Sequence, residues 1–196
     1  MATTRENKTI SNFKAALIGG GARPNLFEVE LTTLPAGITW DPETFRYLCK
    51  AAALPASNIA QIDVPFRGRI FKVAGDRTID QWSITVINDE GFRLRNAFEE
   101  WVDLIAKLDN NLGATDPTAY MTNAKVFQLG RGSSPQSQTN AGSANAVLKE
   151  YEFIDIFPTT VSAIDLSYDS TDAIEEFTVD FQVQSFNYVG AGSPNG

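Results

Sequence analysis

The feature that most constrains the fold is a strict alternation near the end of the chain, EEFTVDFQVQSFNY, residues 175–188. Large apolar side chains occupy every second position, namely Phe177, Val179, Phe181 and Val183. The residues between them are polar, namely Thr178, Asp180, Gln182 and Gln184. Neighbouring side chains of a strand point to opposite faces, so this run predicts a strand with one face in a core and one in water. The alternation slips by one residue before Phe186 and Tyr188, as a β-bulge would produce.

The same period of two recurs along the chain. In TIDQWSITVIND, residues 78–89, one face carries Trp82, Ile84 and Val86 and the other carries Gln81, Ser83 and Thr85. Further strands are predicted over 25–31, 124–130 and 147–157, the last with another slip of one residue. Between 58 and 75 the pattern predicts a hairpin with strands over 58–65 and 68–75, where Pro65 and Gly68 mark a bend or bulge.

Two helices are expected among these strands. GFRLRNAFEEWVDLIAKL, residues 91–108, places an apolar stripe at three- and four-residue spacing, with Asn88 or Asp89 as a cap and with pairs of opposite charge, Arg95 with Glu99 and Asp103 with Lys107. A second helix begins at Asp41-Pro42, ends before Pro55, and has one apolar face made of Phe45, Leu48, Cys49 and Ala52. The chain is therefore expected to be mainly β (α+β), an antiparallel β-sandwich or barrel of about seven strands with one prominent amphipathic helix packed on it.

The length of 196 residues, 43% of them hydrophobic, suits one domain, which we place at residues 25–189. Residues 1–24, which include a run of three glycines, are expected to be a flexible arm. RGSSPQSQTNAGSANA, within residues 130–146, has no large apolar side chain and is expected to be a mobile loop. Residues 190–196 are expected to be a disordered tail.

Composition argues against most enzyme classes and cofactors. The chain has no histidine, and its one cysteine, Cys49, lies in an apolar context typical of a buried, unreactive thiol. Ser-His and Cys-His nucleophiles and thiolate metal clusters are thereby excluded. No run of 18 apolar residues occurs, so we expect a soluble, unsecreted protein with no direct insertion into a membrane. Because the usual nucleophile pairs and metal ligands are missing, we also expect a non-enzymatic protein with no cofactor and no small-molecule substrate.

Charge is distributed unevenly around a net of −8. Residues 1–149 hold all 16 Lys and Arg against 15 acids, whereas residues 150–196 hold nine acids and no base. The predicted hairpin alone carries the cations Arg67, Arg69, Lys72 and Arg77. A solvated acidic surface would account for the imbalance, and so would a surface that repels a polyanion or meets a basic partner.

Several segments, in this order, resemble the tail tube proteins of contractile-tailed bacteriophages. They are LPASNIAQIDVPFRGRIFKVAGDR, QWSITVIND, FEEWVDLI and FPTTVSAIDLSYDSTDAIEEFTVDFQVQ, and the resemblance spans about residues 25–189. In that family a Trp-centred strand follows a basic hairpin, and an FP turn leads through an IDLS-like strand to a closing strand. The 130–146 loop departs from the family as an insertion, and Phe186 stands where relatives often place Trp.

The resemblance implies a non-enzymatic subunit that forms six-membered rings, which stack into a hollow tube with a continuous β-barrel as its lumen. The implied partners are further copies of the chain, a tail sheath protein, a baseplate initiator, a tail terminator, a tape-measure protein and, in passage, genomic DNA. The implied location is the virion tail, assembled in the cytoplasm of the host bacterium.

Three groups of residues are predicted to serve such an assembly. The first is an interface between copies, in which Phe66, Arg67, Arg69, Ile70, Phe71, Lys72 and Arg77 meet Asp165, Asp169, Asp172, Glu175 and Glu176. The second lines the lumen with neutral or acidic side chains, namely Gln81, Ser83, Thr85, Thr178, Asp180, Gln182 and Gln184. The third, Glu99, Glu100 and Asp103, is predicted to contact the sheath. An ordinary solvated surface would explain the last two groups equally well.

Two other functions fit parts of this pattern. Inner tubes of phage-like secretion and injection machines share the architecture but pass proteins rather than DNA. A small carbohydrate-binding sandwich could use Trp40, Trp82 and Trp101 to stack on sugars, although Trp82 and Trp101 fall on predicted core faces. Nucleic-acid binding by the basic hairpin is disfavoured, because the chain is acidic and offers neither a stacking platform nor a recognition helix.

Overall fold

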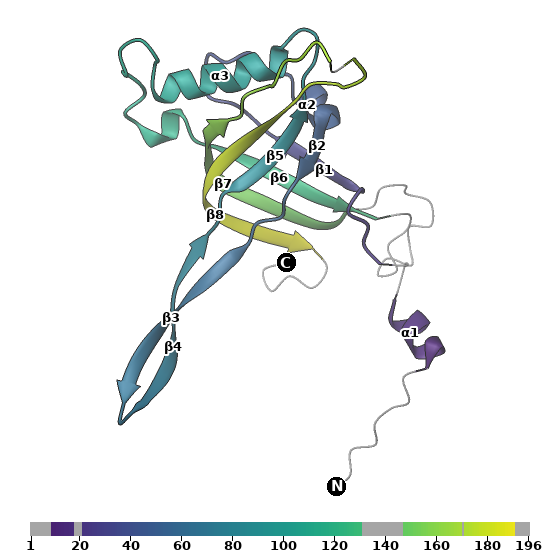
Figure 1. Ribbon diagram of the computed structural model, residues 1–196, viewed down its shortest axis with the longest axis vertical. Coiled ribbons are helices and arrows are strands. Elements are labelled where there is room, and N and C mark those ends of the chain that lie inside the picture. Colours follow the sequence, from purple (N-terminus) through teal and green to yellow (C-terminus); the bar gives the residue numbers. More distant parts are fainter. Residues whose placement is uncertain (1–8, 18–20, 131–146, 170, 191–196) are drawn as a thin grey trace. The chain divides into compact units, whose positions relative to one another are not determined.

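Antiparallel strands make up most of the fold in the computed structural model, which describes residues 9–17, 21–130, 147–169 and 171–190. The strands of one sheet lie in the order β1 (Phe27–Leu31), β6 (Thr122–Leu129), β7 (Val147–Val161), β8 (Glu176–Gly190), β5 (Trp82–Ile87) and β2 (Cys49–Ala52). A separate two-stranded sheet pairs β3 (Ser57–Phe66) with β4 (Arg69–Ile79). Figure 1 shows the six-stranded sheet curling like a barrel. The predicted mainly β class is confirmed, with eight strands in the described residues rather than about seven.

The chain divides into two units. One contains residues 29–126 and 151–188, and the other contains residues 1–28, 127–150 and 189–196. The predicted loop 130–146 and tail 190–196 lie outside the described residues except for their first residues, Gly130 and Gly190. Within the predicted N-terminal arm, residues Ile10–Ala16 form a short helix, α1. Among the described residues, no helix has the length and apolar character needed to cross a membrane.

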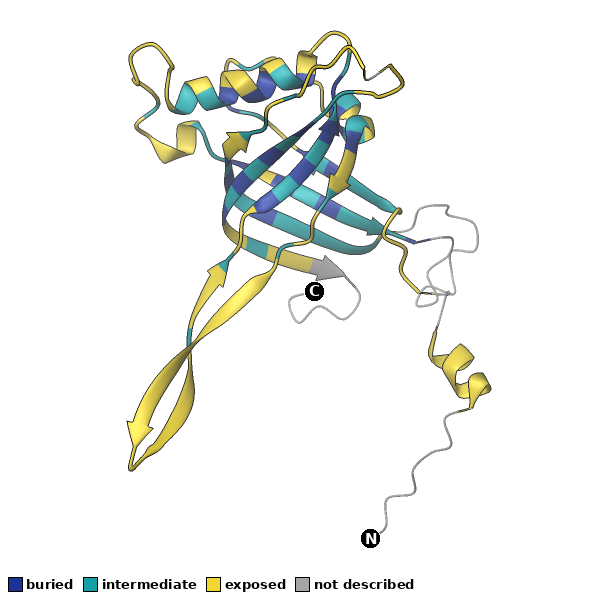
Figure 2. Ribbon diagram, viewed as in Figure 1, coloured by how far each residue is buried: buried dark blue, intermediate teal, exposed yellow. Residues whose placement is uncertain are grey.

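The core of the larger unit forms where β5 pairs with β8 beneath helix α3 (Arg93–Ile105). Trp82 lies opposite Phe181 in the register, and Val86 lies opposite Phe177. Phe98 of α3 makes edge-to-face contacts with both phenylalanines, at centroid distances of 6.1 Å. These five side chains are buried, as the alternation in β5 and β8 and the stripe in α3 predict (Figure 2).

Two indole groups tie the core to the surrounding backbone. Trp82 stacks on Phe153 at 4.4 Å, and its Nε1 donates to the carbonyl of Ala53 at 2.8 Å. Trp101 donates its Nε1 to the carbonyl of Tyr120 at 2.7 Å, just after the 3-10 helix η2 (Pro117–Ala119). A buried Trp N–H needs such an acceptor, so these bonds fix the loops that bring the chain back to the sheet.

The second predicted helix is shorter than expected. Helix α2 spans Pro42–Leu48, and the chain then enters strand β2. Cys49 lies four residues after Phe45, a spacing that also fits one face of a helix. In the structure, however, Cys49 is buried in β2 and pairs with Val86 of β5. The expectation of a helix through Ala52 was therefore wrong, because pairing with β5 overrides the local pattern.

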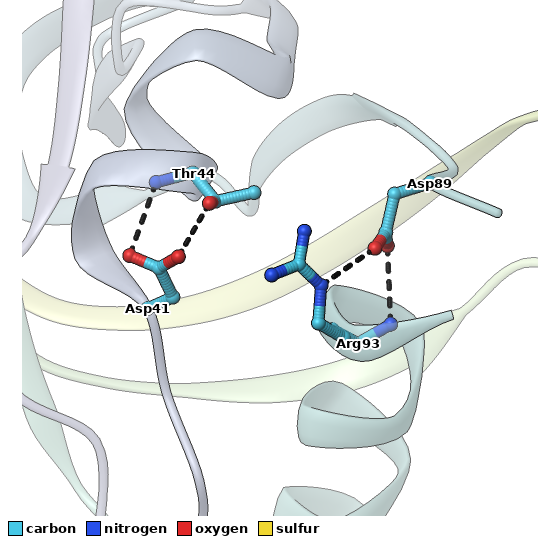
Figure 3. A network of polar contacts seen from close by, with 4 residues as sticks. All are labelled: Asp41, Thr44, Asp89 and Arg93. Atoms are coloured by element: carbon cyan, nitrogen blue, oxygen red, sulfur yellow. Dashed lines mark hydrogen bonds and ion pairs between the residues drawn. The ribbon is translucent and has the colours of Figure 1, made fainter. Parts of the chain in front are cut away.

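Carboxylates stabilise the starts of α2 and α3 (Figure 3). Asp41 accepts from the backbone N–H of Thr44 at 3.3 Å and from the Thr44 hydroxyl. Asp89 accepts from the backbone N–H of Arg93 at 3.1 Å and from its Nε at 2.9 Å. Asp89 thus acts at the start of α3 as predicted, although the residue at the N-cap itself is Phe92, in the left-handed region with φ of 51°. At both helix starts, a negatively charged carboxylate accepts a hydrogen bond from a backbone N–H group.

Strand β7 is longer than predicted and bends where the sequence slips. Asp155 has φ of 54°, and buried positions shift from Phe153 to Ile156 across it, which confirms the expected bulge. Phe157 and Pro158 lie inside β7 rather than in a turn. Residues 162–169, where an IDLS-like strand was expected, have no strand. Both expectations were wrong, and the described residues of the connection from β7 to β8, 162–169 and 171–175, contain no strand or helix.

Candidate functional site

The β3–β4 hairpin turns tightly through Arg67 and Gly68. Both have positive φ, 48° and 81°, and Phe66 pairs with Arg69 across the turn, as in a two-residue type I′ turn. Pro65 lies within β3 opposite Ile70, so it marks no bend, contrary to the sequence prediction.

The irregularity of the hairpin lies nearer its base. The register shifts between Ile59 and Gln61, and a Cβ on Gly75 would lie 3.0 Å from the carbonyl oxygen of Ala60. The close approach of the two backbones explains the glycine.

The hairpin has one strongly apolar face. Cross-strand pairing places Ile62 beside Val73 and Val64 beside Phe71. By alternation the apolar face consists of Ile62, Val64, Phe66, Phe71 and Val73. Every residue of β3 is exposed, and Figure 2 shows both strands almost entirely in the colour of exposed residues. Phe66 and Phe71 are 65% and 66% exposed, which is unusual for phenylalanines in a regular strand.

The predicted cations of the hairpin do not share one surface. Lys72 lies opposite Asp63 on the other face, and its Nζ donates to Gln61 Oε1 at 3.3 Å. Arg67 is at the turn, its guanidinium 5.4 Å from the ring centroid of Phe66. Arg69 lies opposite Phe66 and so borders the apolar face. The sequence predicted this set of residues but not their division between faces.

The predicted acidic partners also divide into two groups. Asp165, Asp169 and Asp172 are exposed in the connection between β7 and β8. Glu175 instead accepts from Asn88 Nδ2 at 3.0 Å, and Glu176 forms an ion pair with Lys50 at 2.5 Å.

The same connection also exposes apolar side chains, which the sequence analysis did not select. Leu166, Tyr168 and Ile174 are among the most exposed large apolar residues of the chain. These three residues follow neither a helical nor a strand period, so periodicity in the sequence does not identify them.

The residues predicted to line a lumen do lie together, on the polar face of β5 and β8. Ser83 lies opposite Asp180, to whose carboxylate its hydroxyl donates, and Thr85 lies opposite Thr178. Gln81 Nε2 donates to the hydroxyl of Thr159 of β7 at 3.3 Å. Gln182 and Gln184 continue this face by alternation along β8.

The carboxylates predicted to meet a sheath lie on the exposed side of α3. Glu99, Glu100 and Asp103 are all exposed. Glu99 pairs with Nε of Arg95 at 2.6 Å, which confirms the predicted i,i+4 ion pair. Arg95 also donates from Nη1 to the carbonyl of Ser162 at 2.6 Å, so it anchors the helix to the end of β7.

Two of the three tryptophans and the one cysteine are buried, which argues against sugar stacking and thiol chemistry at these residues. No group of three or more His, Cys, Asp or Glu in the described residues could hold a metal ion. Burial raises the pKa of the Cys49 thiol to about 12, which makes it a poor nucleophile. Trp82 and Trp101 have no exposed surface with which to stack on a sugar ring.

Comparison with known proteins places the chain among tail proteins of phages. The family model described as phage tail tube protein matches residues 22–189. Tail tube protein gp19 of Enterobacteria phage T4 is 37% identical over 161 residues, covering 82% of this chain and 88% of the relative. The chain belongs to the phage tail tube protein family. It is therefore a structural component of a virion tail and not an enzyme, as predicted.

One further tail tube protein matches in sequence, and chains of contractile injection systems match in fold. The tail tube protein of Serratia phage KSP90 is 22% identical over 177 residues, covering 89% of this chain and 93% of the relative. A chain of the sheath–tube complex of the extracellular contractile injection system PVC aligns with a TM-score of 0.57 at 9% identity, covering 94% of this chain and all of that one. A chain of the anti-feeding prophage baseplate, solved with sixfold symmetry, aligns with a TM-score of 0.61 at 12% identity, covering 88% and 97% of the two chains.

Proposed function

We propose that copies of this tail tube protein associate head to tail through the β3–β4 hairpin, forming six-membered rings that stack into a hollow tube. The observation that carries the proposal is the apolar face of the hairpin, which has five large side chains and no cover in the described part of the chain. A two-stranded hairpin is at best marginally stable alone in water, so a partner surface is needed to hold it.

Burial of this face would supply most of the affinity. Fully burying one Val, Ile or Phe side chain contributes roughly 1.5–3 kcal/mol. A surface ion pair contributes only about 0–1 kcal/mol. The apolar residues therefore hold the copies together, whereas Arg67 and Arg69 set the register between them.

The connection between β7 and β8 of the adjacent copy fits as the receiving surface. Residues 57–79 carry four cations and two acids, a sum of +2, and residues 162–175 carry four acids and no base, a sum of −4. The connection also exposes Leu166, Tyr168 and Ile174, which match an apolar face. Because the two surfaces differ, the contact is head to tail and can repeat around a ring and along a tube.

The polar face of β5 and β8 suits the wall of a conduit for DNA. Each Lys or Arg that meets phosphate adds salt-dependent attraction, which would slow a passing polyanion. Lys50, on the neighbouring strand β2, is already paired with Glu176 of β8. An injection tube that carries protein is the second candidate, supported by the fold shared with a chain of the PVC sheath–tube complex.

Similar chains in solved assemblies support a sheath and a baseplate as further partners. The PVC chain comes from a sheath–tube complex and the anti-feeding prophage chain from a sixfold baseplate. We therefore place a contractile sheath outside the tube, against Glu99, Glu100 and Asp103, and a baseplate initiator and a tail terminator at its ends. A tape-measure protein inside would set its length, with assembly in the cytoplasm of the host bacterium.

A matched pair of hairpin variants tests the proposal. Phe71→Ser removes one side chain from the apolar face, and Gln61→Ser removes one from the opposite face. In negative-stain electron microscopy of the purified chain at rising concentration, we expect hollow rings or tubes from the wild type and from Gln61→Ser. Phe71→Ser should need at least about ten times the concentration, the loss expected for a central interface residue. Equal tube formation by both variants would reject the hairpin as the main contact.

A further inference from the structure

The short helix α1 presents an apolar face that no part of the tube contact described above uses. Its first turn is capped by Thr9, whose hydroxyl accepts from the N–H of Asn12 at 3.3 Å. Ile10, Phe13 and Leu17 follow at spacings of three and four residues, so they lie along one side. They are 73%, 64% and 45% exposed.

A helix of this length needs a surface to hold it. It has seven residues, whereas isolated helices shorter than about 12–15 residues are marginal in water. Amphipathic segments with anchors at such spacings commonly bind in apolar grooves of a partner.

An apolar groove of about 540 Å³ lies at the C-terminal end of α3, bounded on one side by residues Ala36–Ile38. Its apolar lining includes Ile38, Leu104 and Leu108. Leu108, which the sequence places on the core face of the helix, lies beyond the helix end and is 96% exposed. The rim carries Glu100, Asp103 and Asp109 together with one cation, Lys107.

We propose that α1 of one copy inserts its apolar face into the α3 groove of an adjacent copy. The charges match, since residues 1–17 carry Arg5, Lys8 and Lys14 against Glu6, a sum of +2. The groove rim, with three acids and one base, sums to −2. Lys14 lies in the last turn of α1, next to the apolar face, where it can meet this rim.

The chain after α1 is long enough for an exchange between copies. Six residue steps separate Leu17 from Arg23, whose carbonyl accepts from the N–H of Leu26 and from Gln128 Nε2, and three of the residues between them are consecutive glycines. Fully extended, six steps span about 21 Å. That exceeds the radius of gyration of about 15 Å expected for a domain of this size.

The proposal rests on self-association of the chain but not on the hairpin contact, so the two can fail separately. Its test uses two single variants, Phe13→Cys and Leu108→Cys, purified apart, mixed at a concentration that gives tubes, and mildly oxidised. A disulfide requires the two Cα atoms within about 7 Å, so an intermolecular bond reports docking. Native Cys49 should not compete, because it is buried.

We expect a disulfide-linked heterodimer from the mixture, and little of it when Asn12→Cys, on a different side of α1, replaces Phe13→Cys. Absence of the heterodimer while tubes form would overturn the proposal, whatever else occupies the groove. A bond formed only within the double variant Phe13→Cys/Leu108→Cys would also overturn it, because docking would then occur within one copy. Absence of tubes under all conditions would instead reject the proposed function.

A charge substitution provides the second readout. Phe13→Glu puts a carboxylate on the docking face, and Ala15→Glu puts one on the opposite face. We expect Phe13→Glu to raise the concentration needed for tubes about tenfold, with rings still formed at high concentration, and Ala15→Glu to leave it unchanged. Equal behaviour of the two variants would contradict docking through this face.

Discussion

The hairpin and the β5–β8 core share the same alternation of apolar and polar residues, yet the outcomes are opposite. Trp82 of β5 has no exposed surface, whereas Phe71 of β4 is 66% exposed. Helix α3 covers β8 through Phe98, and no comparable helix covers the hairpin among the described residues. Period two therefore determines which residues share a face, but whether that face is buried depends on what packs against it. We propose that the surface that covers the apolar face of the hairpin belongs to another copy of the chain.

The largest expected effect comes from breaking the core. Trp82→Ala removes a side chain that stacks on Phe153 and donates to the carbonyl of Ala53, and it leaves a cavity beside Phe153 and Phe181. We expect a loss of about 3–5 kcal/mol in the free energy of unfolding, measured by urea denaturation of the dilute chain. Val73→Ala in the hairpin should change that free energy by less than about 0.5 kcal/mol. Similar losses for the two variants would remove the distinction between core and hairpin.

The next effect concerns assembly rather than folding. Arg67→Glu together with Arg69→Glu should leave the unfolding curve unchanged but give short tubes or none at concentrations where the wild type forms long ones. The reason is repulsion from the acidic connection, and the loss should be about tenfold in the required concentration. Normal tubes from this double variant would show that the basic residues do not set the contact.

A rescue experiment sharpens this prediction. Asp169→Arg with Asp172→Arg, combined with the reversed hairpin in one chain, should restore part of the tube length. Reversal of Glu99 and Glu100 to Arg on α3 is the matched control and should restore none. Rescue by the α3 control alone would show that the acidic surface that receives the hairpin lies on α3 and not on the connection between β7 and β8.

A smaller effect is expected at the bulge of β7. Asp155 holds φ of 54°, which glycine adopts without strain. We expect Asp155→Gly to be neutral or stabilising by up to about 1 kcal/mol, and Asp155→Val to destabilise by about 1–3 kcal/mol, because a β-branched residue is strained there. Thermal unfolding of the two variants checks the order, and a more stable valine variant would contradict the bulge.

The smallest effect concerns pH. Hydrogen bonds from the Thr44 hydroxyl and N–H lower the pKa of Asp41. Burial raises the pKa of Asp89, but the hydrogen bond and positive charge of Arg93 outweigh it, so this pKa is also lowered. Both carboxyls then stabilise the fold above their unfolded pKa of about 3.9, and this stabilisation is lost as pH falls through the folded values.

A double substitution isolates these two groups from the other carboxylates. Asp41→Asn with Asp89→Asn should lower the unfolding temperature at pH 7, and this difference from the wild type should shrink as pH falls through the folded pKa values of the two carboxyls. An equal decrease at every pH would mean that the charges of the two residues contribute nothing.

The sequence predicted the core well because regular periods and large apolar residues determine it. The faces of β5 and β8, the α3 stripe through Trp101, and the bulge at Asp155 all follow from spacing. The end of α2 did not, because Cys49 fits both a helical stripe and a strand, and only pairing with Val86 decides between them. The turn predicted at Phe157–Pro158 was wrong for the same reason, because a proline can also lie within a strand that bends.

For the candidate site, the sequence pattern predicted which residues of β5 and β8 share a face but not how the hairpin residues divide between two faces. Spacing grouped Ser83 and Thr85 with Asp180, and the register confirms that they share one polar face. The hairpin residues were selected both for charge and for apolar character, and of the apolar ones Phe66 and Phe71 share the exposed apolar face whereas Ile70 lies on the other face. Exposure depends on every other element of the fold, so no local pattern contains it.

Hydrogen exchange of the hairpin tests the central claim most directly. Amide exchange of residues 57–79 would be measured by mass spectrometry in dilute chains and in assembled tubes, with residues 82–87 of β5 as the internal reference. We predict fast exchange of the hairpin in dilute chains, strong slowing in tubes, and little change in β5, because only the hairpin gains its cover on assembly. Equally fast exchange of the hairpin in tubes would contradict the account, since the apolar face would then remain uncovered in the assembly.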